Sequence, residues 1–519
     1  MLRVRDAVES DDEAIRDIFV ATYGNDYAYP AFYDLHTIRK LIYADDNVLV
    51  VAEDEDTGRV IGTGSVVLQS GAYADLVGEF GRLVVHPDAR GKGCANRIME
   101  ARIERVQSRL HLGLVENRVM HPYSQKVSAS HGFTPLGFIP HKLRILTREH
   151  ISLYGRYFGD SLSLRRNHPR IIPEAAAIAE LVLAGLGLRP DAIIDDHSAS
   201  YPQSEPRHYE LEELTTAGYA TLLRIERGRV RHREIFGPMR LHYGLFQLQA
   251  RHSSYLIARR DGQIAGAIGY VFDELERNVR VLELISVHDG PIRYLLETLL
   301  ETCRQTLGAH YVEVDVSAYA PHMQRTLLEL GFLPVAYIPA LVFHDVERLD
   351  GVRMVRLLTP FSAADVQLHE QSRPLAELVI RAFEEREIQP RIAEAAPNTK
   401  LFHGLNAEQS RQLATICRLT RFRGGEQIVR HGEADGMTHV LLSGAANVII
   451  PGRGRVGVVA AGECLGEMSL LEAMPHSATA VAVTDVETAA IRHTDFTSLV
   501  RMRPDIAAIV FRNLASGLG

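Results

Sequence analysis

A glycine-bearing loop in front of a helix is the part of this sequence whose residue types and spacing best suit ligand chemistry. The stretch GEFGRLVVHPDARGKGCANRIME has a β-rich run that reaches Val85, a turn with Pro87, and Gly91 and Gly93 just before an amphipathic helix. Backbone N–H groups at a helix start attract anions, and glycine lets a ligand approach the backbone closely. The loop therefore predicts a pyrophosphate-binding site that requires no metal ion.

The elements around this loop must place it at the end of a strand. Short β-branched runs predict strands over 48–53, 60–69, 80–86 and 112–119, and the segment 93–110 has the apolar spacing of a helix. Strands and helices that follow one another in this way are typical of a mixed α/β fold.

The sequence also contains an internal repeat. HPYSQKVSASHGFTPLGFIP, which begins at His121, aligns without gaps with APHMQRTLLELGFLPVAYIP, which begins at Ala320, at an offset of 199 positions. Seven positions are identical: Pro122, Gln125, Gly132, Phe133, Pro135, Ile139 and Pro140 fall on Pro321, Gln324, Gly331, Phe332, Pro334, Ile338 and Pro339. Because both copies show the same order of predicted elements, the sequence predicts a domain duplication.

The loop residues resemble a family signature. Arg90-Gly91-Lys92-Gly93-Cys94-Ala95 resembles the Arg/Gln-x-x-Gly-x-Gly/Ala motif of the GNAT superfamily of acyltransferases, and the resemblance extends over residues 1–148. It implies an α/β (α+β) GNAT fold, present twice in this chain. It also implies that these six residues hold the pyrophosphate of acetyl-CoA or another acyl-CoA, and that Leu83, Val84 and Val85 line its pantetheine arm.

The same resemblance suggests residues for acid–base chemistry. Transfer to an amine needs a neutral nitrogen, so a base must take a proton from an ammonium ion. Glu79 lies eleven residues before Arg90, where several members of the family carry this base. The alternative is that Glu79 pairs with Arg82 or meets solvent.

The general acid is harder to assign. Ser128 stands where members of the family commonly carry a Tyr, and His121 stands where they often carry Asn. Tyr123, Ser124 or a water molecule are therefore the candidates for protonating the departing thiolate. A CoA thiolate is already a tolerable leaving group, which lowers the need for an acid.

The second copy lacks the loop motif. In place of HPDARGKGCA it has HDGPIRYLLE, with Pro291, which has no N–H, directly after Gly290. The distance from His288 to Ala320 is 32 positions, whereas the matching distance from His86 to His121 is 35, so this copy has three residues fewer. We expect this copy to bind acyl-CoA weakly or not at all and to serve mainly as a structural partner. Glu283 remains a candidate for lining a substrate groove.

The C-terminal region resembles cyclic-nucleotide-binding domains. Glycines punctuate short apolar runs from Arg421 to Ile491, as in an all-β jelly roll. The resemblance places a phosphate-binding cassette at Gly466-Glu467-Met468-Ser469-Leu470-Leu471 and Pro475-His476-Ser477-Ala478-Thr479. We expect Gly466, Glu467, Met468, Ser469, His476 and Ser477 to form the nucleotide site.

His476 stands where binding members of that family carry Arg. A His is mostly neutral at pH 7, and the loss of one charge-assisted contact weakens binding about tenfold to a hundredfold. A cyclic nucleotide is therefore a candidate effector, with another anion, or a domain retained only for contacts, as the alternatives.

Composition restricts the remaining functions. The net charge of -8 gives no general attraction to nucleic acid or anionic membrane, and the four cysteines include no CxxC pair, which argues against a disulfide framework or zinc module. The longest apolar run is too short for a membrane span, so a cytoplasmic, soluble protein is expected. We expect no metal, no nucleic-acid partner and no membrane partner, and an assembly of identical chains is compatible with the sequence.

These observations predict five segments and one principal function. The segments are a GNAT domain (1–148), a helical connector (149–205), a degenerate GNAT-like domain (206–348), a helical linker (349–398) and a cyclic-nucleotide-binding-like, all-β domain with flanking helices (399–519). The predicted function is an acyl-CoA-dependent N-acyltransferase, with acetyl-CoA as donor and an amine acceptor that is a small molecule or a protein lysine. The alternative is a non-catalytic ligand-sensing or scaffold protein.

Overall fold

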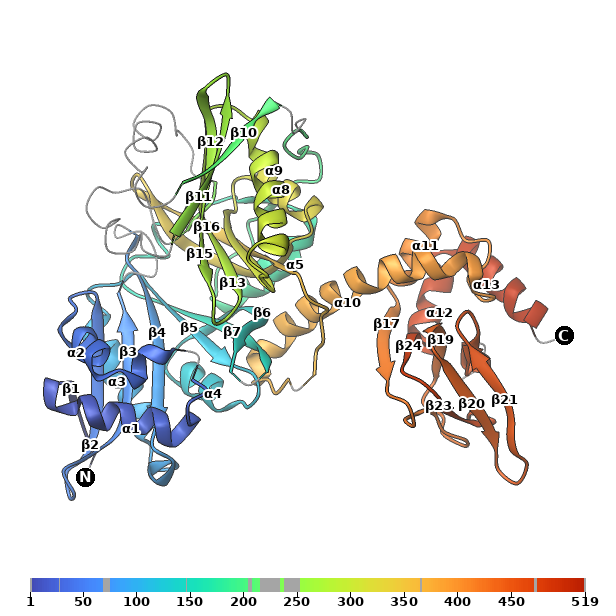
Figure 1. Ribbon diagram of the computed structural model, residues 1–519, viewed down its shortest axis with the longest axis horizontal. Coiled ribbons are helices and arrows are strands. Elements are labelled where there is room, and N and C mark those ends of the chain that lie inside the picture. Colours follow the sequence, from blue (N-terminus) through green and yellow to red (C-terminus); the bar gives the residue numbers. More distant parts are fainter. Residues whose placement is uncertain are drawn as a thin grey trace. The chain divides into compact units, whose positions relative to one another are not determined.

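The protein, as a computed structural model, forms two compact units, Met1–Val379 and Ile380–Gly519 (Figure 1). The structure describes residues 2–27, 29–68, 75–145, 147–203, 208–214, 234–237, 253–364, 366–470 and 474–517. The first unit is built around a 14-stranded sheet, and the second unit contains two four-stranded sheets.

The first half of the large sheet follows the predicted order of elements. It comprises β1 (Leu2–Asp6), α1 (Asp12–Tyr23), α2 (Leu35–Tyr43), β2 (Asn47–Asp54), β3 (Arg59–Val67), β4 (Val77–Val85), α3 (Cys94–Val106), β5 (Leu112–Arg118), α4 (Tyr123–Ser130), β6 (Thr134–Arg144) and β7 (Arg148–Tyr157). The predicted strands and helix are confirmed to within a few residues, although α3 ends at Val106 and not at Leu110. Gln69, predicted to end a strand, lies outside the described residues.

Alternation along β2 explains why helices cover both faces of this half. Leu49 and Val51 point into a core that includes Ile15 of α1, whereas Val50 and Ala52 point into a core that includes Ile98 of α3. Successive side chains of a strand face opposite sides of the sheet. Because β2 is apolar on both faces, it needs a helix on each, and α1 and α3 provide them.

The second half repeats this arrangement. It comprises β10 (Glu210–Leu214), β11 (Ser253–Arg260), β12 (Gln263–Asp273), β13 (Asn278–Ser286), α8 (Gly290–Gln305), β14 (Tyr311–Ser317), α9 (Pro321–Glu329), β15 (Leu333–His344) and β16 (Glu347–Leu357). The strand order is β1-β2-β3-β4-β5-β7-β6 in the first half and β10-β11-β12-β13-β14-β16-β15 in the second. The predicted duplication is therefore confirmed.

The two halves join where β6 pairs with β15. The pair is antiparallel and places Gly137 opposite Ala336. These two residues are separated by the repeat offset of 199, so the same position of each copy meets at the junction. A Cβ atom on Gly137 would lie 2.3 Å from the Cβ of Ala336, which explains why glycine is required there.

Helical segments connect the halves and the units. Between the halves, α5 (Pro173–Gly185) has a proline in its first turn. In the chain it lies between the two strands of a short parallel pair, β8 (Arg170–Ile171) and β9 (Ile193–Ile194). After the second half, α10 runs from Arg373 to Ala395 and contains Pro390. The helix continues through this proline. Ile388 and Ile392, on either side of the proline, are fully buried in the core of the second unit, and this packing opposes a break.

The second unit is a β-sandwich with flanking helices, as predicted. It comprises α11 (Ala407–Ala414), β17 (Cys417–Phe422), β18 (Gln427–Val429), β19 (Met437–Ser443), β20 (Ala445–Ile450), β21 (Gly454–Ala460), β22 (Cys464–Leu465), β23 (Thr479–Ala482), β24 (Val486–Arg492), α12 (His493–Met502) and α13 (Pro504–Gly517). One sheet has the order β17-β24-β19-β22 and the other β18-β23-β20-β21.

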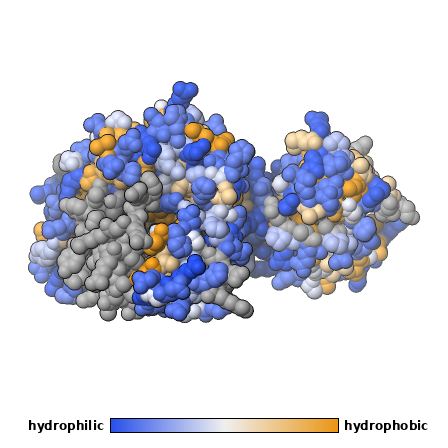
Figure 2. All heavy atoms as spheres, turned by 90° about the horizontal axis from the view of Figure 1, so that it is seen from above, coloured by the Kyte–Doolittle hydropathy of each residue, from blue (hydrophilic) through white to orange (hydrophobic). Residues whose placement is uncertain are grey.

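Apolar surface patches, disulfides, membrane-spanning helices and metal-binding clusters are the features that would indicate another function. Figure 2 shows a mainly hydrophilic face on which apolar residues form small patches. The four cysteines are free thiols. Within the described ranges, no helix is long and apolar enough to cross a membrane, and no group of three or more His, Cys, Asp or Glu side chains is placed to hold a metal ion.

Candidate functional site

Strands β4 and β5 separate in the middle of the first half. They pair in parallel from Val77 opposite Leu112 to Phe80 opposite Val115, where the ladder ends. Both strands then continue, β4 to Val85 and β5 to Arg118. The opening between them offers unpaired backbone N–H and C=O groups to a ligand.

A bulge directs β4 away from β5. Its register with β3 shifts between Thr63 and Ser65, and Arg82 has a φ of 55°, which non-glycine residues seldom adopt. The buried Arg102 of α3 donates hydrogen bonds to the carbonyl oxygens of Gly81 (3.0 Å) and Ser65 (3.1 Å). Burial, and next the charge of Arg82, lowers the pKa of Arg102 to about 9. The guanidinium therefore stays charged at neutral pH and holds the bulge.

A cavity of about 200 Å³ lies in this opening. It is lined by residues 79–84 of β4 and 115–118 of β5, by Tyr23, Tyr27 and Tyr29, and by Ser124 and Ser128 of α4. The Tyr23 and Tyr27 rings stack with centroids 4.8 Å apart. A mostly apolar wall with a few converging polar groups is typical of a small-molecule site.

Two carboxylates face this cavity. Glu79 lies 3.2 Å from the Nη1 atom of Arg82, so the pairing that the sequence left as an alternative is present. Glu116 of β5 is the other, and burial raises its pKa above the usual value. The assignment of Glu79 as a general base stays a prediction, because an ion pair does not exclude that role.

Several polar atoms in the cavity lack partners. Asn117 Nδ2, His121 Nδ1 and Ser124 Oγ are buried and have no hydrogen bond within the described part of the chain. Burial, and next the charge of Arg118, lowers the pKa of His121, which keeps the ring neutral at pH 7. Unpaired buried polar groups are costly, so these three are suited to hydrogen bonds with a polar ligand.

The glycine-bearing loop has the geometry of an anion site. Gly91 and Gly93 have φ values of 78° and 76°, and a Cβ atom on either would point into open space. Gly93 precedes α3 without any side-chain cap, and Arg90 and Lys92 are exposed beside it. Cys94 is buried at the first helical position, next to Ala95. The first-turn amides of α3 therefore have no side-chain acceptor, and the loop fits a pyrophosphate.

The remaining predicted residues of this site are placed unequally. Leu83 and Val84 line the cavity, whereas Val85 lies beyond it along β4. Ser124 lines the cavity, but Tyr123 is 70% exposed and does not. Of the two side chains proposed as general acid, Ser124 is thus the better placed.

The equivalent opening in the second half contains part of the chain itself. Strands β13 and β14 pair only from Asn278 opposite Tyr311 to Arg280 opposite Glu313. Beyond that point, residues 234–237 run antiparallel to β14: the N–H of Phe236 donates to the carbonyl of Asp315, and the N–H of Ser317 donates to the carbonyl of Glu234, both at 2.7 Å.

This inserted segment leaves little room. A Cβ atom on Gly237 would lie 1.8 Å from the carbonyl oxygen of Leu282 in β13, so only glycine fits between the strands. The cavity that remains beside Phe236 and Gly237 has about 20 Å³, close to the space of a single water molecule. Glu283 of β13 accepts a hydrogen bond from the Tyr255 hydroxyl at 2.5 Å.

The cassette of the second unit forms a turn between its two sheets. Gly466 has a φ of 71°, and residues Glu467–Leu470 form a short 3₁₀ helix. Glu467 is half-buried, whereas Met468 and Ser477 are exposed. The side chain of Ser469 and the whole of Leu471 lie outside the described part of the chain.

His476 is buried beneath this turn. Its Nε2 lies 2.8 Å from Asp435 Oδ1, and a Cβ atom on Gly466 would lie 2.7 Å from its Cε1. The neighbouring His439 is buried as well, and burial lowers its pKa to about 4. The imidazole at the position of the usual Arg thus has an acidic partner within the domain.

The sequence did not single out three residues that the cavity brings together. Arg102 holds the bulge, Asn117 presents an unpaired amide, and Glu116 presents a carboxylate. Only Glu116 has a signal in the sequence, because the repeat offset of 199 aligns it with another acidic residue, Asp315.

Comparisons with known proteins find both predicted modules. The family described as acetyltransferase (GNAT) domain matches residues 45–139, and the cyclic nucleotide-binding domain family matches residues 419–503. The cyclic AMP receptor protein of Thermus thermophilus is 31% identical over 22% of this chain and 56% of its own length. Glutaminase 1 of Bradyrhizobium diazoefficiens is 30% identical over 22% of this chain and 19% of its own. The chain therefore spans about half or less of the length of these curated relatives.

A solved structure similar to part of this chain is the GNAT superfamily phosphinothricin acetyltransferase of Sinorhizobium meliloti in complex with AcCoA. It is 21% identical, covers 31% of this chain and 89% of its own, and has a TM-score of 0.28. The family matches, together with the two folds, lead to one identification. The chain combines a GNAT acetyltransferase domain with a C-terminal cyclic nucleotide-binding domain.

Proposed function

We propose that the first half of the large sheet transfers an acetyl group from acetyl-CoA to an amine, and that the second unit regulates this activity by binding a cyclic nucleotide. The observation that supports the proposal most is the opening between β4 and β5, which ends at a helix start without a side-chain cap. An extended thioester arm with an anionic end requires such a combination.

The residues of this opening have separate tasks in the proposed reaction. The amides at Gly91 to Ala95, with Arg90 and Lys92 beside them, hold the pyrophosphate of the donor. Asn117, His121 and Ser124 offer hydrogen-bonding groups to the arm. Glu79 takes a proton from the acceptor ammonium, so that the neutral nitrogen can attack the thioester carbonyl. The C–N bond forms as the C–S bond breaks. Ser124 or water protonates the sulfur and takes up the proton that the acylated nitrogen loses.

One donor site in each chain follows from the difference between the halves. In the second half, residues 234–237 lie where the donor's arm would lie in the first. We therefore assign donor binding to the first half alone. The acceptor is a small-molecule amine or a protein lysine, with neither nucleic acid nor membrane as a partner.

Calorimetric titration of acetyl-CoA into the full chain tests the proposal. We expect one site, and we expect Gly93→Glu to lower its affinity at least about tenfold, because a carboxylate would face the pyrophosphate. Gly58→Glu is the matched control: Gly58 also has a positive φ (66°) and open space around it, but lies in the turn between β2 and β3.

Three results would contradict the donor site. They are a lack of binding, equal binding to wild type and Gly93→Glu, and a second site of similar affinity. Acetyl-CoA binding without transfer to any amine would instead support the ligand-sensing alternative.

A further inference from the structure

The two carboxylates in the cavity differ in how closely they are paired with positively charged side chains. Glu79 has Arg82 at 3.2 Å, in the same strand. Glu116 has no hydrogen bond to any described residue, and its one ion pair there, to Arg353 Nη1, has a distance of 3.8 Å. Its side chain is 32% exposed inside the opening. Glu116 thus accepts no hydrogen bond from a described residue at either oxygen, whereas one oxygen of Glu79 is paired with Arg82.

The second half provides an internal comparison. Glu116 corresponds to Asp315 by the repeat offset and by its place in β14. Asp315 stands opposite Arg353 in β16, which donates two hydrogen bonds to it, at 2.7 and 2.9 Å. Glu116 stands opposite Leu153 in β7, so its own half provides no such arginine.

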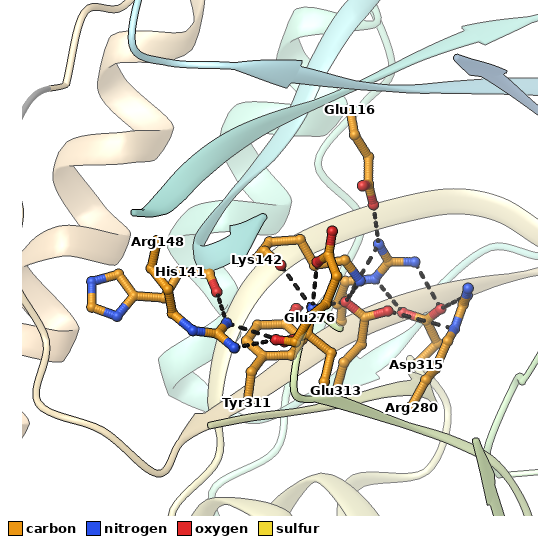
Figure 3. Close-up of polar contacts among 11 residues, drawn as sticks. Glu116, His141, Lys142, Arg148, Glu276, Arg280, Tyr311, Glu313 and Asp315 are labelled. Carbon is orange, nitrogen blue, oxygen red and sulfur yellow. Dashed lines mark hydrogen bonds and ion pairs between the residues drawn. The ribbon is translucent and has the colours of Figure 1, made fainter. Parts of the chain in front are cut away.

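Arg353 instead reaches Glu116 from the second half. Figure 3 shows Glu116 directed toward a cluster of charged residues that also includes Lys142, Arg280, Glu313 and Asp315. The Arg353 side chain is only 4% exposed and is fixed by its bonds to Asp315. Because these bonds hold the Arg353 guanidinium in place, it attracts Glu116 to a fixed position without forming a hydrogen bond with it.

The surroundings of Glu116 indicate the kind of ligand. Tyr27, Tyr29, Leu143 and Ile151 line the same cavity and present aromatic or aliphatic surface. A carboxylate within such a wall favours a cation carried on an apolar chain, because burial leaves it short of water and aromatic faces attract cations. An alkylammonium ion has both features.

We propose that Glu116 binds the acceptor as an alkylammonium ion, and that Arg353 of the second half is a positioning residue for Glu116. This inference rests on the proposed function. In this proposal Glu116 binds the ammonium group, whereas Glu79 is the base of the proposed reaction. The second half thereby contributes to acceptor recognition although it holds no donor.

The test uses two probes of the same length on the full chain saturated with CoA. Pentylamine is an ammonium ion at neutral pH, and pentanol is its neutral match. We expect calorimetry to show that Glu116→Gln weakens pentylamine binding about tenfold to a hundredfold and leaves pentanol unchanged. Glu104→Gln, on the exposed face of α3, is the control and should bind both probes as wild type does.

The outcomes separate this inference from the proposed function. A lack of pentylamine binding, or equal binding to wild type and Glu116→Gln, overturns the role of Glu116. Loss of CoA binding in the wild type, measured first, overturns the proposed function instead. Glu116→Asp keeps the charge and should bind pentylamine with intermediate affinity.

A double-mutant cycle tests the positioning role. Arg353→Lys keeps the charge but not the planar fork, and should weaken pentylamine binding about threefold in wild type. In the Glu116→Gln background it should have no further effect, because the group that it positions is gone. Equal effects in both backgrounds would mean that Arg353 is only structural.

Discussion

Replacement of the buried His150 should make the first unit less sensitive to acid, so that its free energy of unfolding falls less as the pH is lowered. His150 is 3% exposed, stacks on Phe138 with centroids 5.3 Å apart, and accepts a hydrogen bond from the N–H of His141. Burial, and next the charge of His141, lowers its pKa from 6.5 to about 3. The folded unit therefore holds this ring neutral at pH values at which the unfolded chain protonates it.

The lowered pKa of His150 determines the direction and the size of its effect on the free energy of unfolding. Above pH 6.5 both states are neutral and the group has no pH-dependent effect, whereas below 6.5 only the unfolded state takes up the proton, so the free energy of unfolding falls. One pKa unit corresponds to about 1.4 kcal/mol, so the loss reaches about 2 kcal/mol by pH 5 and about 4 kcal/mol near pH 3. His150→Phe removes the titration and fits the aromatic surroundings, at a constant cost for the lost hydrogen bond.

The assay is pulse proteolysis in urea between pH 7 and pH 5, with mass spectrometry to follow peptides of the first unit. The difference between wild type and His150→Phe should change by about 2 kcal/mol over this range, in favour of the variant at low pH. His197→Phe is the control, since that side chain is 95% exposed. Parallel curves for wild type and His150→Phe would refute the reasoning.

Two further predictions concern the two ligand sites. Glu79→Gln should lower kcat more than about tenfold and leave the Kd of acetyl-CoA nearly unchanged, since Gln cannot take a proton; unchanged turnover at saturating donor would remove Glu79 from the mechanism. His476→Arg should tighten cyclic AMP or cyclic GMP binding about tenfold, because Arg supplies a permanent charge to the phosphate and can keep the contact with Asp435. Titration of both nucleotides into wild type and variant measures this, and no gain from Arg would mean that the cassette is not aligned as proposed.

Local patterns in the sequence were sufficient for much of this molecule. The loop at Gly91 and Gly93 combines a positive-φ requirement with a helix start, and both are properties of a few adjacent residues. The duplication was visible because twenty residues align without a gap. Both kinds of signal need no knowledge of tertiary contacts.

The features that could not be predicted from the sequence depend on contacts between distant segments of the chain. Arg102 acts on Gly81, 21 residues away, and on Ser65, 37 residues away. Residues 234–237 insert between two strands that follow them in the chain. Pro390 is held inside α10 by packing on either side. A helix, strand or loop propensity describes none of these.

The filled opening and the salt bridge of Asp315 have one physical cause. Residues 234–237 cover Asp315, which is 4% exposed, and a buried carboxylate without a cation is costly. Arg353 offsets that cost with two hydrogen bonds. In the first half no described residue fills the opening, so the Glu116 side chain is 32% exposed in the cavity and needs no arginine of its own. The repeat thus holds an acidic residue at one position in two settings: bonded to Arg353 where residues 234–237 fill the opening, and exposed to the cavity where no described residue fills it.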